Sequence, residues 1–240
     1  MYEEDDEDRI DAARHLARLD RRAAAAAFRD IACDDGVDDE SRIDAAEELA
    51  GIDPRAAAEA YRMIACDDGV HDGLRLEAAE RLPELDPRAA AAAFHAIACD
   101  DGVDDGLRSA AGEQLAEIDP RAAVEALRII ASDDSVHDGL RSSAAEQLAE
   151  IDPRAAVEAL RIIASDDGVD DGLRSAAAEQ LADIDPQAAV DAFRSMHRHD
   201  RPGHGRSFAG AGPRPGWPGQ PEPPFPPEPP LPPEPPLPRW

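Results

Sequence analysis

The chain has no Lys, Asn or Thr, and aromatic residues make up only 4% of its 240 residues. With so few large side chains, a core must be assembled from Ala, Leu, Ile and Val, most of which contribute little apolar area each. No stretch approaches the roughly 18 consecutive apolar residues that a membrane span needs. We therefore expect no membrane segment, and stability that comes from many small contacts added together.

Only three cysteines occur, Cys33, Cys66 and Cys99, and no CxxC pair is present, so we expect neither a zinc site nor a disulfide framework. The first nine residues, MYEEDDEDR, are acidic and lack the apolar core of a secretion signal. Both observations predict a protein of the reducing cytoplasm. Nucleophile-elbow, P-loop and dinucleotide-binding motifs are lacking too, and no pair of carboxylates stands out as an acid–base couple. We expect no enzymatic activity, cofactor or metal.

What the chain does contain is a 33-residue period. The dipeptide Asp-Pro recurs at residues 53–54, 86–87, 119–120, 152–153 and 185–186. Residues 113–134 are identical to residues 146–167, which indicates growth by recent duplication. A fixed period of this length is typical of a solenoid, in which stacked units bury their apolar faces against each other.

Residues 105–136 show how one unit is built. An apolar stripe at helical spacing is formed by Leu107, Ala110, Ala111, Leu115 and Ile118. Asp119-Pro120 then ends this helix and begins another, because Pro disfavours helical geometry in the preceding residue but suits the first helical position, and Asp is a strong N-cap. The second helix is expected to bury Ala123, Ala126, Leu127 and Ile130. Each unit is therefore predicted to be two antiparallel helices followed by a loop, with Val136 turned inward.

Each unit has an Arg, an Ala pair and a Leu on the first helix, then an Asp-Pro turn, an apolar second helix and an acidic loop. Residues 173–193, LRSAAAEQLADIDPQAAVDAF, are one example. This pattern resembles the short HEAT-like repeats of bacterial solenoid proteins. The resemblance implies an all-α fold, a right-handed αα superhelix of six 33-residue two-helix repeats, in residues 1–196. Residues 197–240 are predicted to be an Arg/His/Gly linker and a disordered proline-rich tail.

Most of the net charge of −28 belongs to the predicted solenoid. Residues 1–196 contain 20 Arg against 49 Asp and Glu, whereas residues 197–240 contain 5 Arg against 4 acids. Nucleic-acid binding depends mainly on neutralising phosphates, so we expect no direct contact with DNA or RNA. An acidic array attracts basic proteins and peptides, which suggests a basic partner; alternatively, the charge only keeps an Ala-rich rod in solution.

An acidic loop such as DDGVDDG follows each of the first five repeats. Calcium and magnesium prefer oxygen ligands, but the spacing does not match an EF-hand loop, which needs acids at positions one, three and five and a Glu at twelve. Diffuse counterion binding is the better interpretation. The glycine at the third loop position predicts a left-handed residue after the helix.

Stacking places equivalent residues of successive repeats in columns. The column that opens the first helices is expected to pair with loop acids of the neighbouring units and contains Arg9, Arg42, Arg75, Arg108, Arg141 and Arg174. The column that follows the Asp-Pro turn contains Arg22, Arg55, Arg88, Arg121, Arg154 and Gln187. The column in the middle of the second helices contains Arg29, Arg62, His95, Arg128, Arg161 and Arg194.

The middle of the second helices supplies the candidate partner-binding residues, because these helices usually line the concave face of such stacks. The candidates are Arg62, His95, Arg128, Arg161, Glu125 and Glu158. In one interpretation they form a mixed-charge groove that holds an extended acidic or polar segment. In the other they form i,i+3 or i,i+4 ion pairs on an exposed face, each worth only about 0.2–0.5 kcal/mol.

Residues 221–240 are proline-rich with a six-residue beat, EPPFPP, EPPLPP, EPPLPR, which favours polyproline II. Phe225, Leu231, Leu237 and Trp240 are candidate contacts for a polyproline-reading domain or an aromatic-lined pocket. The alternative is a semi-rigid spacer.

These observations predict a cytoplasmic scaffold or adaptor that binds a protein or peptide on its concave face, with a second contact through the tail. The resemblance also allows an accessory enzyme subunit that holds a substrate, as in HEAT-like subunits of bilin-attaching enzymes. A DNA-repair role comes third, because it requires a basic concave face.

Overall fold

A computed structural model of the chain describes residues 3–199, and over these residues it is all-helical without a strand. A first and a second helix alternate along the chain. The first helices are α1 (Glu3–Ala17), α3 (Asp39–Ala50), α5 (Asp72–Glu80), α7 (Asp105–Ile118), α9 (Asp138–Ile151) and α11 (Asp171–Ile184). The second helices are α2 (Arg21–Ala32), α4 (Pro54–Ala65), α6 (Pro87–Ala98), α8 (Pro120–Ser132), α10 (Pro153–Ser165) and α12 (Pro186–His199).

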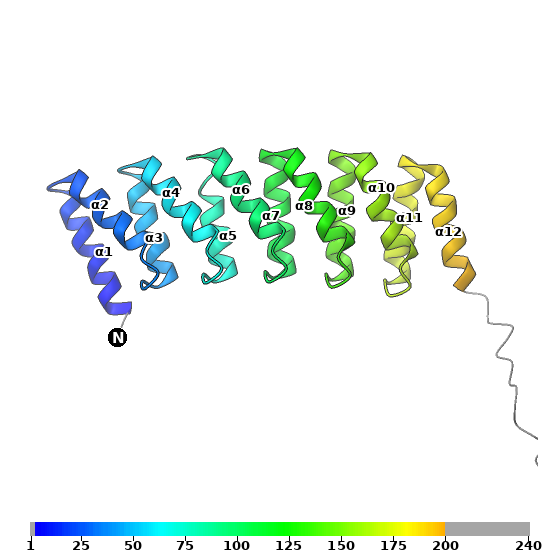
Figure 1. Ribbon diagram of the computed structural model, residues 1–240, viewed down its shortest axis with the longest axis horizontal. Coiled ribbons are helices and arrows are strands. Elements are labelled where there is room, and N and C mark those ends of the chain that lie inside the picture. Colours follow the sequence, from blue (N-terminus) through cyan, green and yellow to red (C-terminus); the bar gives the residue numbers. More distant parts are fainter. Residues whose placement is uncertain (1–2, 200–240) are drawn as a thin grey trace, which may run out of the picture. The chain divides into compact units, whose positions relative to one another are not determined.

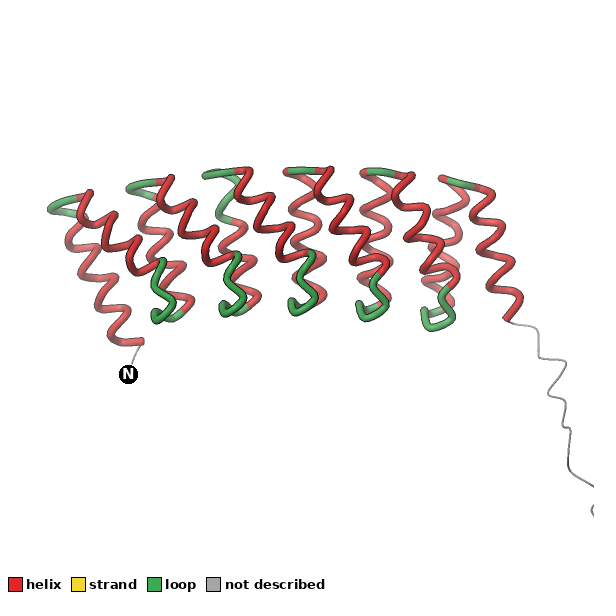
Figure 2. Tube along the Cα trace, in the orientation of Figure 1, coloured by secondary structure: helices red, strands yellow, loops and turns green. Residues whose placement is uncertain are grey.

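The helices form two layers, and each packs against its neighbours in the chain (Figure 1). The first helices make one layer and the second helices the other. The turns inside repeats lie along one edge of the array, and the loops between repeats lie along the opposite edge (Figure 2). The predicted all-α stack of two-helix units is confirmed, while the right-handed sense of the superhelix stays a prediction. None of the described helices combines the length and apolar character that crossing a bilayer requires.

Asp119 shows why the Asp-Pro turn separates two helices. Its backbone N–H donates to the carbonyl of Leu115 at 2.8 Å and ends α7. Its carboxylate accepts the N–H groups of Arg121 and Ala122 at 3.1 and 3.2 Å and begins α8. Pro120 has no N–H that would need an acceptor at the first helical position. An N-cap aspartate of this kind precedes every second helix and typically contributes about 1 kcal/mol.

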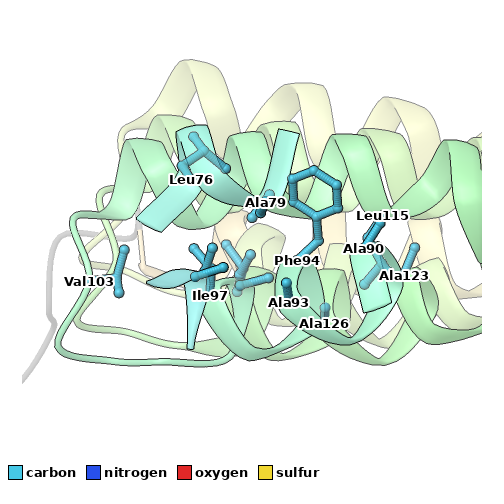
Figure 3. Close-up of a cluster of buried hydrophobic side chains, with 14 of the residues drawn as sticks. Leu76, Ala79, Ala90, Ala93, Phe94, Ile97, Val103, Leu115, Ala123 and Ala126 are labelled. Carbon is cyan, nitrogen blue, oxygen red and sulfur yellow. The ribbon is translucent and has the colours of Figure 1, made fainter. Parts of the chain in front are cut away.

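The core is built mainly of alanine, as the composition requires. Each of the first five second helices also buries two larger side chains three residues apart: Phe28 and Ile31, Tyr61 and Ile64, Phe94 and Ile97, Leu127 and Ile130, Leu160 and Ile163. Phe94 belongs to a cluster that includes Ala79 of α5 and Leu115 of α7 (Figure 3). The loop valines, including Val136, are buried as predicted.

A buried arginine near the start of the first helices ties successive repeats together. Arg108, only 2% exposed, donates to Asp105 of its own helix at 3.3 Å and to Asp133 in the loop that leaves its repeat at 3.4 Å. It also donates to the carbonyl of Ala98, at the end of the preceding repeat, at 3.4 Å. Asp105 accepts the backbone N–H of His137, at the start of the next repeat, at 3.1 Å. The predicted pairing with loop acids is confirmed, but the acid belongs to the arginine's own repeat.

The arginine ladder changes at its two ends. Arg9 donates to Asp34 at 3.1 Å, but its side chain is 43% exposed, far more than those of its equivalents. Arg174 has no loop aspartate ahead of it, since residue 199 is His, and it donates instead to Asp167 in the preceding loop at 3.3 Å. The central repeats therefore have the most complete ladder contacts.

The first aspartate of a loop serves both the loop and the ladder. Asp67 accepts the N–H of Gly69 and a guanidinium N–H of Arg42, each at 3.1 Å. These two contacts, the backbone one foremost, hold the pKa of the Asp67 carboxyl below its usual value. The pKa is lowered in the same way at Asp34, Asp100 and Asp166, whereas at Asp133 the hydroxyl of Ser135 contributes most to the lowering.

The prediction of a left-handed glycine at the third loop position was wrong. Gly36 and its described equivalents do not have the positive φ of that conformation. The loop instead turns through the bond from the glycine N–H to the preceding aspartate, Asp34 in this case. Ser135 makes the same bond at the equivalent position, which shows that the turn does not require glycine.

Candidate functional site

Charge is divided unequally between the two helix layers. The first helices contain 24 Asp and Glu against seven Arg. The second helices contain five Asp and Glu against twelve Arg. The acidic excess of the array therefore comes from the first helices and the loops. The exposed and half-exposed side chains of α2, α4, α6, α8, α10 and α12, which we call the second-helix face, carry more cations than anions.

The predicted mid-helix candidates lie on the second-helix face, in α4, α6, α8 and α10. Arg62 forms an i,i+3 ion pair with Glu59 at 2.7 Å, and this bond lowers the pKa of the Glu59 carboxyl. Arg161 lies 3.5 Å from Glu158. Arg128 forms no ion pair among the described residues, although the sequence around it is identical to that around Arg161. These pairs are exposed and marginal, so the mid-helix guanidinium groups remain accessible to a partner.

His95 and Glu125 complete the described candidates. In repeat three, Ala92 stands where repeats two, four, five and six have an acid, and His95 Nε2 lies 3.8 Å from Cys99 Sγ. Burial raises the pKa of the Cys99 thiol. All three cysteines are free thiols. Glu125 is exposed and forms no ion pair in the part of the chain that the structure describes.

A second column of arginines lies on this face, and the sequence alone gave no reason to expect a role for it. It consists of the exposed arginines that follow the turn, which we call the turn arginines: Arg22, Arg55, Arg88, Arg121 and Arg154. None of them forms an ion pair among residues 3–199. By contrast, every arginine within a first helix, exposed Arg14 included, has at least one acidic partner. The sequence signal that marks this column is the lack of any acid in the first turn of the second helices.

An open groove joins the two cationic columns near the N-terminal end of the array. It has a volume of about 750 Å³ and crosses α2, α4 and α6. Arg29, Arg55 and Arg62 line it, together with three acids. Of these acids, Asp53 caps α4, Asp86 caps α6, and Glu59 is paired with Arg62. The three acids of the groove therefore already have hydrogen-bond partners, whereas Arg55 has no ion-pair partner among residues 3–199.

Exposed apolar side chains lie beside the mid-helix column of the second-helix face. Met63 of α4 is 38% exposed and Ile129 of α8 is 36% exposed, at equivalent positions next to the mid-helix column. Val190 of α12 is also exposed on this layer. The fourth large apolar side chain at an exposed position of residues 3–199 is Leu19, in the turn between α1 and α2. Met63 and Ile129 therefore form the repeated exposed apolar position of the second helices, and such a position is typical of an interaction surface.

The tail candidates Phe225, Leu231, Leu237 and Trp240 lie outside the described residues. Within residues 3–199, no three His, Cys, Asp or Glu side chains are grouped so that they could hold a metal ion.

The fold defines the class of the protein as a tandem helical-repeat solenoid. Comparison with protein family models, with curated proteins and with solved structures finds no match to the chain.

Proposed function

We propose that the chain is a non-catalytic, cytoplasmic interaction scaffold of HEAT type that binds a protein or peptide along its second-helix face. One observation carries this proposal: the second-helix face combines unpaired arginines with exposed apolar side chains, whereas the first helices use their arginines internally. Partner surfaces need both an apolar contact and unsatisfied charge that fixes orientation.

Three further features support the type and setting that we propose. The Asp-Pro turn and the arginine ladder agree with a HEAT-like unit. The last three second helices, α8, α10 and α12, contact each other more extensively than α7, α9 and α11 do, as expected for the inner, concave side of a curved stack. Free Cys33, Cys66 and Cys99 agree with a reducing compartment.

The proline-rich tail would supply a second contact. Phe225, Leu231, Leu237 and Trp240 are the side chains that a polyproline-reading domain or an aromatic-lined pocket would take. Two linked weak contacts raise the overall affinity through effective concentration.

An accessory enzyme subunit is the second candidate, and the groove lined by Arg29, Arg55 and Arg62 favours it. Its volume lies within the range of small-molecule sites. A carboxylate-bearing pigment or metabolite held there would co-purify with the chain. An absorbance scan from 300 to 700 nm of the freshly purified protein tests this candidate.

Affinity capture from host lysate tests the scaffold proposal. The baits are the full chain, residues 1–196 alone, the second-helix variant R128Q/R161Q and the first-layer variant R14Q/R81Q, which removes the same charge. Arg81 directly follows α5 and pairs with Glu47 and Glu77. We expect a protein that is retained by the full chain and by R14Q/R81Q but lost with R128Q/R161Q. Prey that depends on the first-helix arginines and ignores the second-helix ones would contradict the proposed face. Prey lost only on truncation would move recognition to the tail.

A further inference from the structure

We infer that the partner of the second-helix face is an extended acidic protein segment with Asp or Glu at every third residue. This inference rests on the proposed function and names the chemistry of its ligand. It starts from the turn arginines, a regular row of exposed guanidinium groups without partners.

The isolation of the turn arginines is unexpected in this chain. Acids outnumber arginines 53 to 25, and the first-helix arginines all find carboxylates. The nearest acid in sequence, the aspartate of the Asp-Pro turn, is used as a helix cap, as when Asp119 accepts two backbone N–H groups. Each turn arginine therefore points its charge to solvent beside a carboxylate that is already occupied.

The position of these arginines also opposes helix stability. They lie in the first turn of the second helices, where the helix dipole favours acids and disfavours cations. The first helices follow the favourable rule, with Asp39, Asp72 and Asp105 in their first turns. These arginines break a local rule in five successive repeats and gain no ion-pair partner among residues 3–199, which is best explained by a ligand.

The spacing of the row selects the form of the ligand. Packed helices lie 8–10 Å apart, so equivalent arginines recur at about that interval. Three residues of polyproline II advance about 9.3 Å and complete one turn, which returns every third side chain to the same side. An extended strand also advances about 10 Å in three residues, but its side chains alternate between two faces, so every third one would not return to the row. The spacing therefore selects polyproline II. A segment of about 13 residues would therefore offer one carboxylate to each of the five turn arginines.

The mid-helix column provides a second row for the same segment. Arg55 and Arg62 are seven residues apart on α4, about 10 Å along the helix, and the groove lies between them. Met63 and Ile129, next to the second row, offer apolar contact to the residues between the carboxylates. A segment lying along the groove would therefore contact cations on both sides and apolar groups beside them.

An acidic segment fits this surface better than a nucleic acid does. Duplex DNA carries one negative charge for about every 1.7 Å of its axis, so its electrostatic field would also reach the acidic first helices and loops. The first helices and loops hold most of the 53 acids and would repel it. A peptide with one charge in about 9 Å matches the row and carries little charge elsewhere. The basic partner that the net charge suggests would instead suit the first-helix layer.

The test uses the full-length protein and two labelled synthetic peptides of equal composition. The spaced peptide is six successive copies of Glu-Pro-Pro and places a carboxylate at every third residue. The block peptide has the same residues with all six glutamates first and all twelve prolines after them. The proteins are the wild type, the turn-arginine variant R88Q/R121Q and the matched control R14Q/R81Q.

Arg88 and Arg121 are exposed and unpaired, so their replacement should leave the fold intact, which circular dichroism and the melting temperature check. Fluorescence anisotropy at low salt measures the affinities, with a 20-base-pair duplex in parallel.

We expect the spaced peptide to bind at least fivefold more tightly than the block peptide. R88Q/R121Q should weaken the binding of the spaced peptide at least fivefold, and R14Q/R81Q should change it less than twofold. Equal affinity for the two peptides, or equal loss in the two variants, would overturn the inference. Tighter binding of the duplex than of either peptide would overturn it in favour of nucleic acid. The scaffold proposal would survive these failures if a non-acidic prey still depends on Arg128 and Arg161.

Discussion

Replacing Arg108 with Ala should destabilise the array far more than replacing any exposed arginine. Arg108 is buried and donates to Asp133, Asp105 and the carbonyl of Ala98. Removing one partner of a buried ion pair costs about 3–5 kcal/mol when the other charge stays buried. Here Asp105 and Asp133 are about a third and a quarter exposed, so water can partly solvate them. We therefore expect a loss of about 2–4 kcal/mol, which includes the packing of the long side chain.

Urea unfolding followed by circular dichroism at 222 nm measures this loss. Arg128→Ala is the matched control, because Arg128 is exposed and unpaired, and its replacement should change the free energy of unfolding by less than about 0.5 kcal/mol. Arg141→Ala should cost less than Arg108→Ala, because Arg141 Nε has no acceptor whereas Arg108 Nε donates to Ala98. A loss below about 1 kcal/mol for Arg108→Ala, or equal losses at Arg108 and Arg128, would refute the structural role of the ladder.

Four further outcomes are expected. Gly112→Ala should raise the free energy of unfolding in urea by about 0.5–1 kcal/mol, because Ala145 occupies the equivalent position of the near-identical next repeat. A lower free energy of unfolding would mean that Leu127, which would lie 3.0 Å from the new methyl group, cannot shift. Burial raises the pKa of Tyr61 to about 12, so the stability it adds is present below about pH 10 and is lost between pH 10 and 12; Tyr61→Phe should abolish this alkaline loss of melting temperature. The lowered pKa of the loop carboxyls adds stability that is present above about pH 4 and is lost as the pH falls further, and Asp67→Asn should make the acid titration of the melting temperature shallower. Salt should raise the melting temperature by screening the first helices and loops, and a flat profile between 20 and 300 mM NaCl would contradict this.

The fold could be read from the sequence because its signals are local and repeated. The Asp-Pro turn needs only Asp119 and the next three residues to end one helix and begin another. The pairing of the arginine ladder with loop acids was expected from the HEAT-like resemblance, but the sequence did not show that the acid, as at Asp133, belongs to the arginine's own repeat. The left-handed glycine did not follow, because the side chain of Asp34 and the N–H of Gly36 offered the loop another way to turn.

Only part of the candidate site could be predicted from the sequence. The sequence predicted the mid-helix column but could not decide its pairing, since identical residues leave Arg161 near an acid and Arg128 without one. It also could not mark the turn arginines, because each follows an Asp-Pro pair that looks like a neighbouring partner. The structure shows that this carboxylate, for example that of Asp119, already accepts a backbone N–H as a helix cap.

The arginine ladder also makes the length of this array easy to change. In the central repeats, a rung contacts side chains of its own repeat and only backbone groups of the two neighbouring repeats. Arg108 bonds to Asp133 and to the carbonyl of Ala98, and Asp105 accepts the N–H of His137. A whole 33-residue copy can therefore be inserted or removed while every remaining rung keeps its contacts, and residues 113–134 and 146–167 still record one such insertion. Selection can thus lengthen or shorten the array by one repeat, about 10 Å, at a time without changing the packing inside the remaining repeats.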